Sequence, residues 1–210
     1  MKPTYQHPRI AEGLKLLLHR IHHGEIGYHP DQASLWALAF AGLYVLVFQL
    51  NRLFDPIFSV IDERVSMVFL PAFIRVAAIL VAGASGALGL FLGALVLGFM
   101  QDLAVLQNLS QSFFTATAPC LAVLLLRFAM AGRPLAITLS LFLLVALLAS
   151  MFNAMLHHVF WDFYPLTEPV TLVTFWQMLA GDLAGALLGF GFFALVVRAI
   201  ALVRPQNVSD

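Results

Sequence analysis

Residues 69–99 read FLPAFIRVAAILVAGASGALGLFLGALVLGF and contain a single charged side chain, Arg75. A membrane-spanning helix needs about 20 mostly apolar residues, so this stretch alone is long enough to enter a bilayer. The rest of the chain has the same character, since hydrophobic residues make up 61% of its 210 residues and charged residues only 10%. A water-soluble domain of this length could not sustain that balance. We therefore expect an all-α, polytopic membrane helix bundle whose main partner is the lipid bilayer.

Six candidate transmembrane helices follow from the apolar runs. They cover approximately residues 34–51, 67–83, 86–106, 111–130, 135–160 and 172–197. This divides the chain into a cytoplasmic amphipathic amino-terminal segment (1–33), a transmembrane helical bundle (34–200) and a short cytoplasmic tail (201–210). The first segment is predicted to lie on the membrane surface because its apolar residues recur at helical spacing: Leu14, Leu17, Leu18 and Ile21.

The distribution of basic residues predicts the orientation, because short loops that carry Lys and Arg resist translocation. With the amino terminus in the cytoplasm, eight basic residues fall inside: Lys2, Arg9, Lys15, Arg20, Arg127, Arg133, Arg198 and Arg204. Only Arg52 and Arg64 fall in outer loops. We expect a multi-pass protein of a bacterial cell inner membrane with both termini in the cytoplasm.

Glycines at helical spacing predict which helices are interior. Gly89 and Gly93 are four residues apart, and Gly181, Gly185 and Gly189 continue the same spacing near the carboxyl end. Lipid supplies no hydrophobic force between helices, so close packing depends on small residues of this kind. The pattern indicates that these two spans lie inside the bundle.

Arg75 and Asp182 are ionisable residues placed near the middle of their predicted spans. Such residues are costly in hydrocarbon and normally face the protein interior with a partner. Their opposite charges make them natural partners for each other. One interpretation is a buried ion pair that fixes the helix arrangement. The other is a ligand site in which Arg75 binds an anionic group while Asp182 holds the guanidinium in place.

A second polar group lies at the outer ends of the third and fifth predicted spans. It comprises Gln101 and Asp102 at the end of the third span and Asn153, His157, His158, Trp161 and Asp162 at the end of the fifth. Both spans run outward in the predicted topology, so these residues share one level of the membrane, and the first five of them are candidates to line a ligand pocket. Histidines beside carboxylates also allow a proton-sensitive or metal site. The alternative is an interfacial belt, since aromatic residues prefer the headgroup region, and we assign no metal site.

Several function classes find no support in the sequence. The net charge is zero, whereas a nucleic-acid partner requires a concentrated basic surface. The chain contains no Gly-x-Ser-x-Gly elbow, phosphate-binding loop, His-Glu-x-x-His helix or Cys-x-x-Cys pair. We therefore expect no enzyme activity and no cofactor.

Three segments resemble the membrane-associated sensor domain of the first MASE type. They are the quoted stretch from Phe69 to Phe99, the segment LLLRFAMAGRPL and the segment FWQMLAGDLAGALL. The resemblance covers roughly residues 66–200, and its informative positions are Pro71, Gly93 and the Gly181–Asp182 pair. Members of that family usually have about eight spans that feed a cytoplasmic kinase or cyclase domain. The resemblance therefore implies a free-standing sensor, without an output domain, that signals to a separate cytoplasmic partner.

Three functions remain open from the sequence. The first is a sensory, signal-transducing membrane module that binds a small-molecule ligand. The second is a small solute transporter, or the substrate-binding subunit of an energy-coupling transporter, which has a similar number of helices. The third is a structural or assembly factor whose polar residues serve packing alone.

Overall fold

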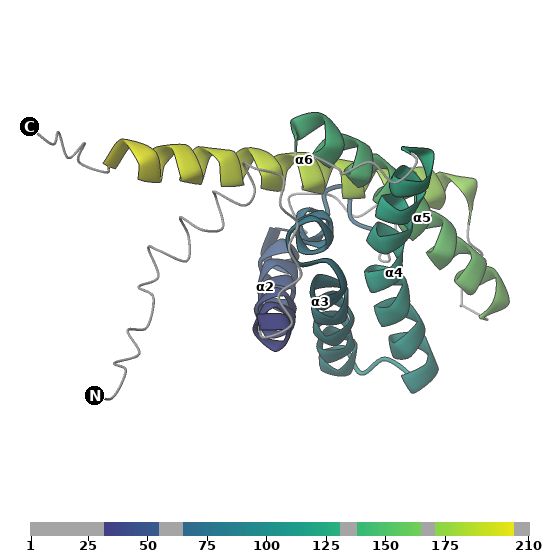
Figure 1. The fold of residues 1–210 in the computed structure, drawn as a ribbon. Helices are drawn as coiled ribbons and strands as arrows, with labels where there is room; N and C mark the ends of the chain where they lie inside the picture. The colour runs from purple at the N-terminus through teal and green to yellow at the C-terminus, as the bar shows by residue number, and fades with distance from the viewer. Residues whose placement is uncertain (1–31, 55–64, 131–137, 165–170, 204–210) are drawn as a thin grey trace, which may run out of the picture.

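The computed structural model describes residues 32–54, 65–130, 138–164 and 171–203 of the chain. These residues are almost entirely helical (Figure 1). The helices are α2 (Ala33–Phe54), α3 (Pro71–Met100), α4 (Val105–Ala129), α5 (Leu139–Phe163) and α6 (Leu172–Val203). Predictions for the amphipathic segment 1–33 fall on residues outside this description, apart from its last two, and so do predictions for most of the tail 201–210.

All five helices are long and apolar enough to cross a membrane. Many of their large apolar side chains point outward, including Leu38, Leu46, Phe99 and Phe128. An exposed apolar surface of this extent is unusual in a water-soluble monomer and is the expected surface of a helix in lipid. The prediction of an all-α, multi-pass membrane bundle is confirmed at this level.

Helix α3 reverses direction at Gly83, which has backbone angles φ 54° and ψ −124°. At its start, the backbone N–H of Leu70 donates to Asn51 Oδ1 near the end of α2 (2.8 Å). At its finish, Met100 Sδ accepts from Gln49 Nε2, also near the end of α2 (3.7 Å). A straight helix of 30 residues would separate its two ends by about 45 Å. Both ends meet the same part of α2, so α3 is a hairpin of two helical arms.

The structure does not confirm six separate helices. The predicted spans 67–83 and 86–106 are the two arms of α3, and Gly83 joins them without a loop. A positive φ of this kind is readily adopted by glycine and costly for other residues. Gly86 then packs directly on the backbone of Ala78 across the turn. Periodicity finds both arms, but it contains no signal for a turn made by one residue.

The boundary between α3 and α4 also differs from the prediction. The arm ends at Met100 instead of residue 106, and α4 begins at Val105 instead of residue 111. Asn108 looks like a loop residue in the sequence, yet it is buried inside α4. Its Nδ2 donates to the Leu95 carbonyl (3.1 Å), and its Oδ1 accepts from Ser112 (3.2 Å). These bonds satisfy the amide and allow a polar segment to remain helical.

The second arm of α3 packs closely against α2 through two glycines. A Cβ atom at Gly89 would lie 2.5 Å from the Ala37 carbonyl oxygen, and one at Gly93 would lie 2.8 Å from that of Ala41. The residue order shows that this arm runs parallel to α2. The turn at Gly83 comes six residues before Gly89 in the chain. It therefore lies at the level where α2 begins.

Helix α6 packs on the start of α3 through its own line of glycines. Gly181 lies against Ser66, Gly185 against Phe69 and Gly189 against Phe73. The backbone N–H of Phe69 also donates to the Gly181 carbonyl (2.9 Å). Both predicted glycine lines therefore mark close helix contacts. Beyond this contact, the carboxyl-terminal part of α6 extends past the other helices (Figure 1).

Apolar side chains fill the half of the bundle formed by the end of α4 and the start of α5. The principal buried cluster joins these helices to the first arm of α3 and to α6, and it contains Ala72, Val76, Leu80, Ala122, Leu126, Leu141, Phe142, Val145, Ala146, Ala149 and Ala186. The opposite end of the bundle is formed by the end of α2, both ends of α3, the start of α4, the end of α5 and the start of α6.

Two alanine substitutions in α6 test the glycine packing. Gly185→Ala should lower the free energy of unfolding by about 1–3 kcal/mol, because its Cβ would overlap the backbone carbonyl of Phe69. Gly191→Ala is the matched control, since a Cβ there meets no atom within 4 Å. The control should be neutral or stabilising by up to about 1 kcal/mol. Unfolding in detergent measures both, and equal destabilisation of the two variants would contradict the packing.

Candidate functional site

A cavity of about 360 Å³ lies at the end of the bundle opposite the apolar cluster. All five helices contribute to its wall: α2, both arms of α3, α4, α5 and α6. Its polar lining is unusual for a chain of this composition and comprises Tyr44, Asn51, Arg52, Ser66, Arg75, Gln101, Gln107, Gln111, Thr115, Asn153, His157, Trp161 and Asp182. The α3 hairpin is essential to this arrangement, because it brings Arg75 and Gln101 to the same cavity.

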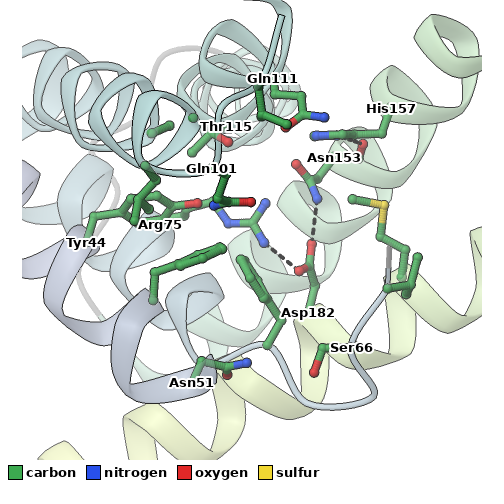
Figure 2. A pocket seen from close by; sticks show the side chains of 18 of the residues that line it. Tyr44, Asn51, Ser66, Arg75, Gln101, Gln111, Thr115, Asn153, His157 and Asp182 are labelled. Atoms are coloured by element: carbon green, nitrogen blue, oxygen red, sulfur yellow. Dashed lines mark hydrogen bonds and ion pairs between the residues drawn. The ribbon is translucent and has the colours of Figure 1, made fainter. Parts of the chain in front are cut away.

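Three buried side chains from three helices form the floor of the cavity. Arg75 Nη2 donates to Asp182 Oδ1 (2.5 Å), and Asn153 Nδ2 donates to Asp182 Oδ2 (2.9 Å). The two donors approach the carboxylate from different sides (Figure 2). Arg75, Asn153 and Asp182 retain only 4%, 2% and 2% of their exposure. Both carboxylate oxygens are therefore bonded, as a charge buried at this depth requires.

Two polar atoms of this floor have no hydrogen-bond partner among the described residues. They are Arg75 Nε, a donor, and Asn153 Oδ1, an acceptor. Buried polar atoms are nearly always bonded, so each such exception points to a missing partner such as water or a ligand. Both atoms belong to side chains that line the cavity. The floor thus combines a satisfied ion pair with unused hydrogen-bonding capacity.

Aromatic rings pack against Arg75 and His157. The Arg75 guanidinium carbon lies 5.1 Å from the centre of the Phe69 ring, within the range of a cation–π contact. His157 is buried, its Nδ1 lies 3.0 Å from the Asn153 carbonyl oxygen, and its ring contacts Phe114 and Trp161. Since a carbonyl only accepts, Nδ1 carries the proton. The other ring nitrogen is then an acceptor if the imidazole is neutral.

The cavity changes from buried to exposed along its depth. Arg75, Asn153 and Asp182 at the floor are buried, whereas Arg52 and Gln101 at the rim are exposed. Gln111 lies between these two levels and is partly buried. This gradient from an exposed rim to a charged floor is the arrangement expected of a site that admits a small polar molecule from one end.

The structure brings together five of the seven residues proposed from the sequence. Arg75, Gln101, Asn153, His157 and Asp182 all line the one cavity. From the sequence, Arg75 and Asp182 form one predicted group, and Gln101, Asn153 and His157 belong to another. The two groups are continuous because Asn153 bonds directly to Asp182.

The other two candidates lie outside the cavity lining. Asp102 is exposed in the turn between α3 and α4, with φ 53°. His158 points toward α6, where its Nε2 lies 3.0 Å from the Thr171 carbonyl oxygen and its ring contacts Phe175. It therefore helps to join α5 to α6. In the part of the chain that the structure describes, no three His, Cys, Asp or Glu side chains lie close enough to hold a metal ion.

Helix α4 carries a polar stripe that is not among the predicted site residues. Gln107, Gln111 and Thr115 recur every four residues and all line the cavity. This spacing places them on one helix face and was the available signal. The predicted spans separate Gln107, which lies between them, from Gln111 and Thr115, which lie in the span 111–130, and so divide the stripe. Tyr44, which is buried inside α2, was missed because an isolated tyrosine in an apolar helix carries no distinctive pattern.

Comparisons with known proteins do not add a family. The chain matches no protein-family model, no curated protein and no solved structure at a significant level. The geometry of the cavity therefore carries the functional argument.

Substitutions in the buried pair test its contribution to stability. Asp182→Leu should lower the free energy of unfolding by about 3–5 kcal/mol, because it leaves the Arg75 charge buried without its partner. Adding Arg75→Met should restore more than half of that loss, since the unpaired charge is then gone. Denaturation in detergent gives both values. A double variant no more stable than Asp182→Leu alone would show that the charge imbalance is not the cause.

Proposed function

We propose that this protein is a sensory membrane module that takes a small polar solute into the cavity and signals through α6 to a cytoplasmic partner. The observation that carries the proposal is the floor of the cavity. It holds a buried Arg75–Asp182 pair with free hydrogen-bonding atoms beside it. An ion pair that served packing alone would not require a cavity lined by amides and hydroxyls. The resemblance to the MASE-type sensor domains, stated from the sequence, agrees with this assignment.

Helix α6 is suited to carry a signal. Asp182 lies on it at the cavity floor, and Gly181, Gly185 and Gly189 give it a smooth contact with the start of α3. Its far part has exposed apolar side chains, including Phe192 and Leu195. A solute that changes the bonding of Arg75 would alter the force on Asp182, and a rigid helix would transmit the shift along its length.

We infer that the cavity end faces outward and that both termini are cytoplasmic. Helix α2 leads toward the cavity end, and the α3 hairpin leaves from and returns to that end. Helix α6 runs in the same direction as the first arm of α3, away from the cavity end. The start of α2 and the end of α6 therefore share one side of the bundle. The bias of Lys and Arg places that side in the cytoplasm.

Two cysteine substitutions at opposite ends of α4 test the orientation. In a Cys120→Ala background, Ala104→Cys should react with a membrane-impermeant maleimide added outside the cell, and Ala129→Cys should not. Both residues are exposed, so a difference in labelling reports side and not burial. Labelling only of Ala129→Cys would reverse the proposed orientation.

Photo-crosslinking in cells tests the signalling partner. A photoreactive residue in place of Ala199, exposed on α6 beyond the predicted span 172–197, should capture a discrete soluble signalling protein. The same residue in place of Val173, exposed at the start of α6, is the matched control and should not. Capture at neither position, together with solute flux in liposomes, would reject the sensor proposal.

A second candidate is the substrate-binding subunit of an energy-coupling transporter. It is favoured by the packed apolar cluster between the cavity and the other end of the bundle. A solute held at the cavity floor would need a partner to open that cluster before it could leave inward. Solute uptake that appears in liposomes only when an ATPase module is added would favour this candidate over the sensor.

A further inference from the structure

We propose that the solute is a small monoanion that also carries an uncharged hydrogen-bond donor, a hydroxyl group, and that Arg75 binds its charged group. This inference rests on the proposed function, because it specifies the solute that the cavity takes. It follows from the donors and acceptors at the cavity floor that have no hydrogen-bond partner among the described residues.

The carboxylate of Asp182 is already occupied, whereas the guanidinium of Arg75 is not. Each Asp182 oxygen accepts one bond, from Arg75 Nη2 and from Asn153 Nδ2. A guanidinium has five N–H donors, and the Asp182 contact uses one of them. Arg75 Nε is buried and has no partner among the described residues. The unused donors therefore call for an acceptor, and a carboxylate matches the planar fork of an arginine best.

The charges that line the cavity favour one negative charge on the solute. Among the described residues that line the cavity, Arg52 and Arg75 are positive and Asp182 is negative. A monoanion at the floor brings the buried part to one negative charge, which Arg52 at the rim balances. A dianion would leave an uncompensated negative charge at low dielectric, and a cation would compete with Arg75 for Asp182.

The amide of Asn153 fixes the second requirement. Its NH₂ group must face Asp182, because its oxygen would repel the carboxylate oxygen at the observed 2.9 Å. The amide oxygen is therefore directed elsewhere, and it is buried without a partner among the described residues. Only a donor can satisfy it, and a hydroxyl group on the solute supplies one without adding a positive charge.

The size of the cavity limits the solute. Its volume of about 360 Å³ is close to the lower limit of ordinary ligand pockets, about 300 Å³. Thr115 and Gln111 on α4 provide further neutral polar contacts along the wall. A short hydroxycarboxylate meets these three conditions together.

Four probes test this inference on the full-length protein in nanodiscs of neutral phosphatidylcholine, with calorimetric titration as the measurement. Glycerate carries both required groups, glyceramide lacks the charge, propionate lacks the donor, and glycerol 3-phosphate carries an additional charge. Glycerate should bind at least tenfold more tightly than each of the other three. Glyceramide binding as tightly as glycerate would overturn the requirement for an anion, and equal propionate binding would overturn the requirement for a donor. In both cases the solute-binding function would stand.

Tighter binding of glycerol 3-phosphate than of glycerate would overturn the requirement for a single negative charge. The solute-binding function would again stand. Binding by none of the four would reject the inference and the proposed function together. This ranking of the four probes uses the unaltered protein, so a variant that fails to fold cannot affect it.

A matched pair of substitutions then locates the binding group. Arg75→Lys keeps a positive charge beside Asp182 but removes the guanidinium fork, so glycerate affinity should fall at least tenfold while the ligand-free protein remains folded. Arg52→Lys makes the same change at the exposed rim and should change the affinity less than threefold. Equal losses in the two variants would show that the guanidinium at the cavity floor contributes no more than the one at the rim, and would overturn the role of Arg75.

Discussion

The buried pair of Arg75 and Asp182 is the constraint on which the rest of the structure depends. A charge inside a membrane protein is tolerated only when protein groups replace its hydration. Asp182 obtains that replacement from Arg75 on α3 and from Asn153 on α5. Three helices are thereby fixed relative to one another at one point. The same point is the floor of the cavity, so the requirement for stability and the candidate site coincide.

The contact between these charges is possible because the helix backbones approach closely. Gly185 allows α6 to lie directly on the backbone of Phe69, and Gly93 does the same for the second arm of α3 against α2. The turn at Gly83 returns the chain to the level of its own start. Without that turn, the residues after Leu90 would leave the neighbourhood of Arg75. Small residues thus determine where the polar groups meet.

The two ends of the bundle differ in the polarity of their buried side chains. One end holds a polar cavity, and the other is closed by an apolar cluster that includes Leu126, Phe142 and Val145. Under the proposed function, the apolar cluster would keep a solute in the cavity. Helix α6 touches both regions, through Asp182 and Ala186, and the proposed function gives it the signalling role.

The sequence alone determined the class of fold and most of the charged site. Apolar runs identify helices that need lipid. The free-energy cost of a charged side chain in hydrocarbon then predicts that Arg75 and Asp182 are buried and partnered. The tertiary structure alone decided that two predicted spans form one hairpin, that Asn153 joins two polar groups, and that Asp102 and His158 lie elsewhere. Periodicity is a local property, whereas the angles at Gly83 and the facing of side chains across helices are set by contacts between residues far apart in the chain.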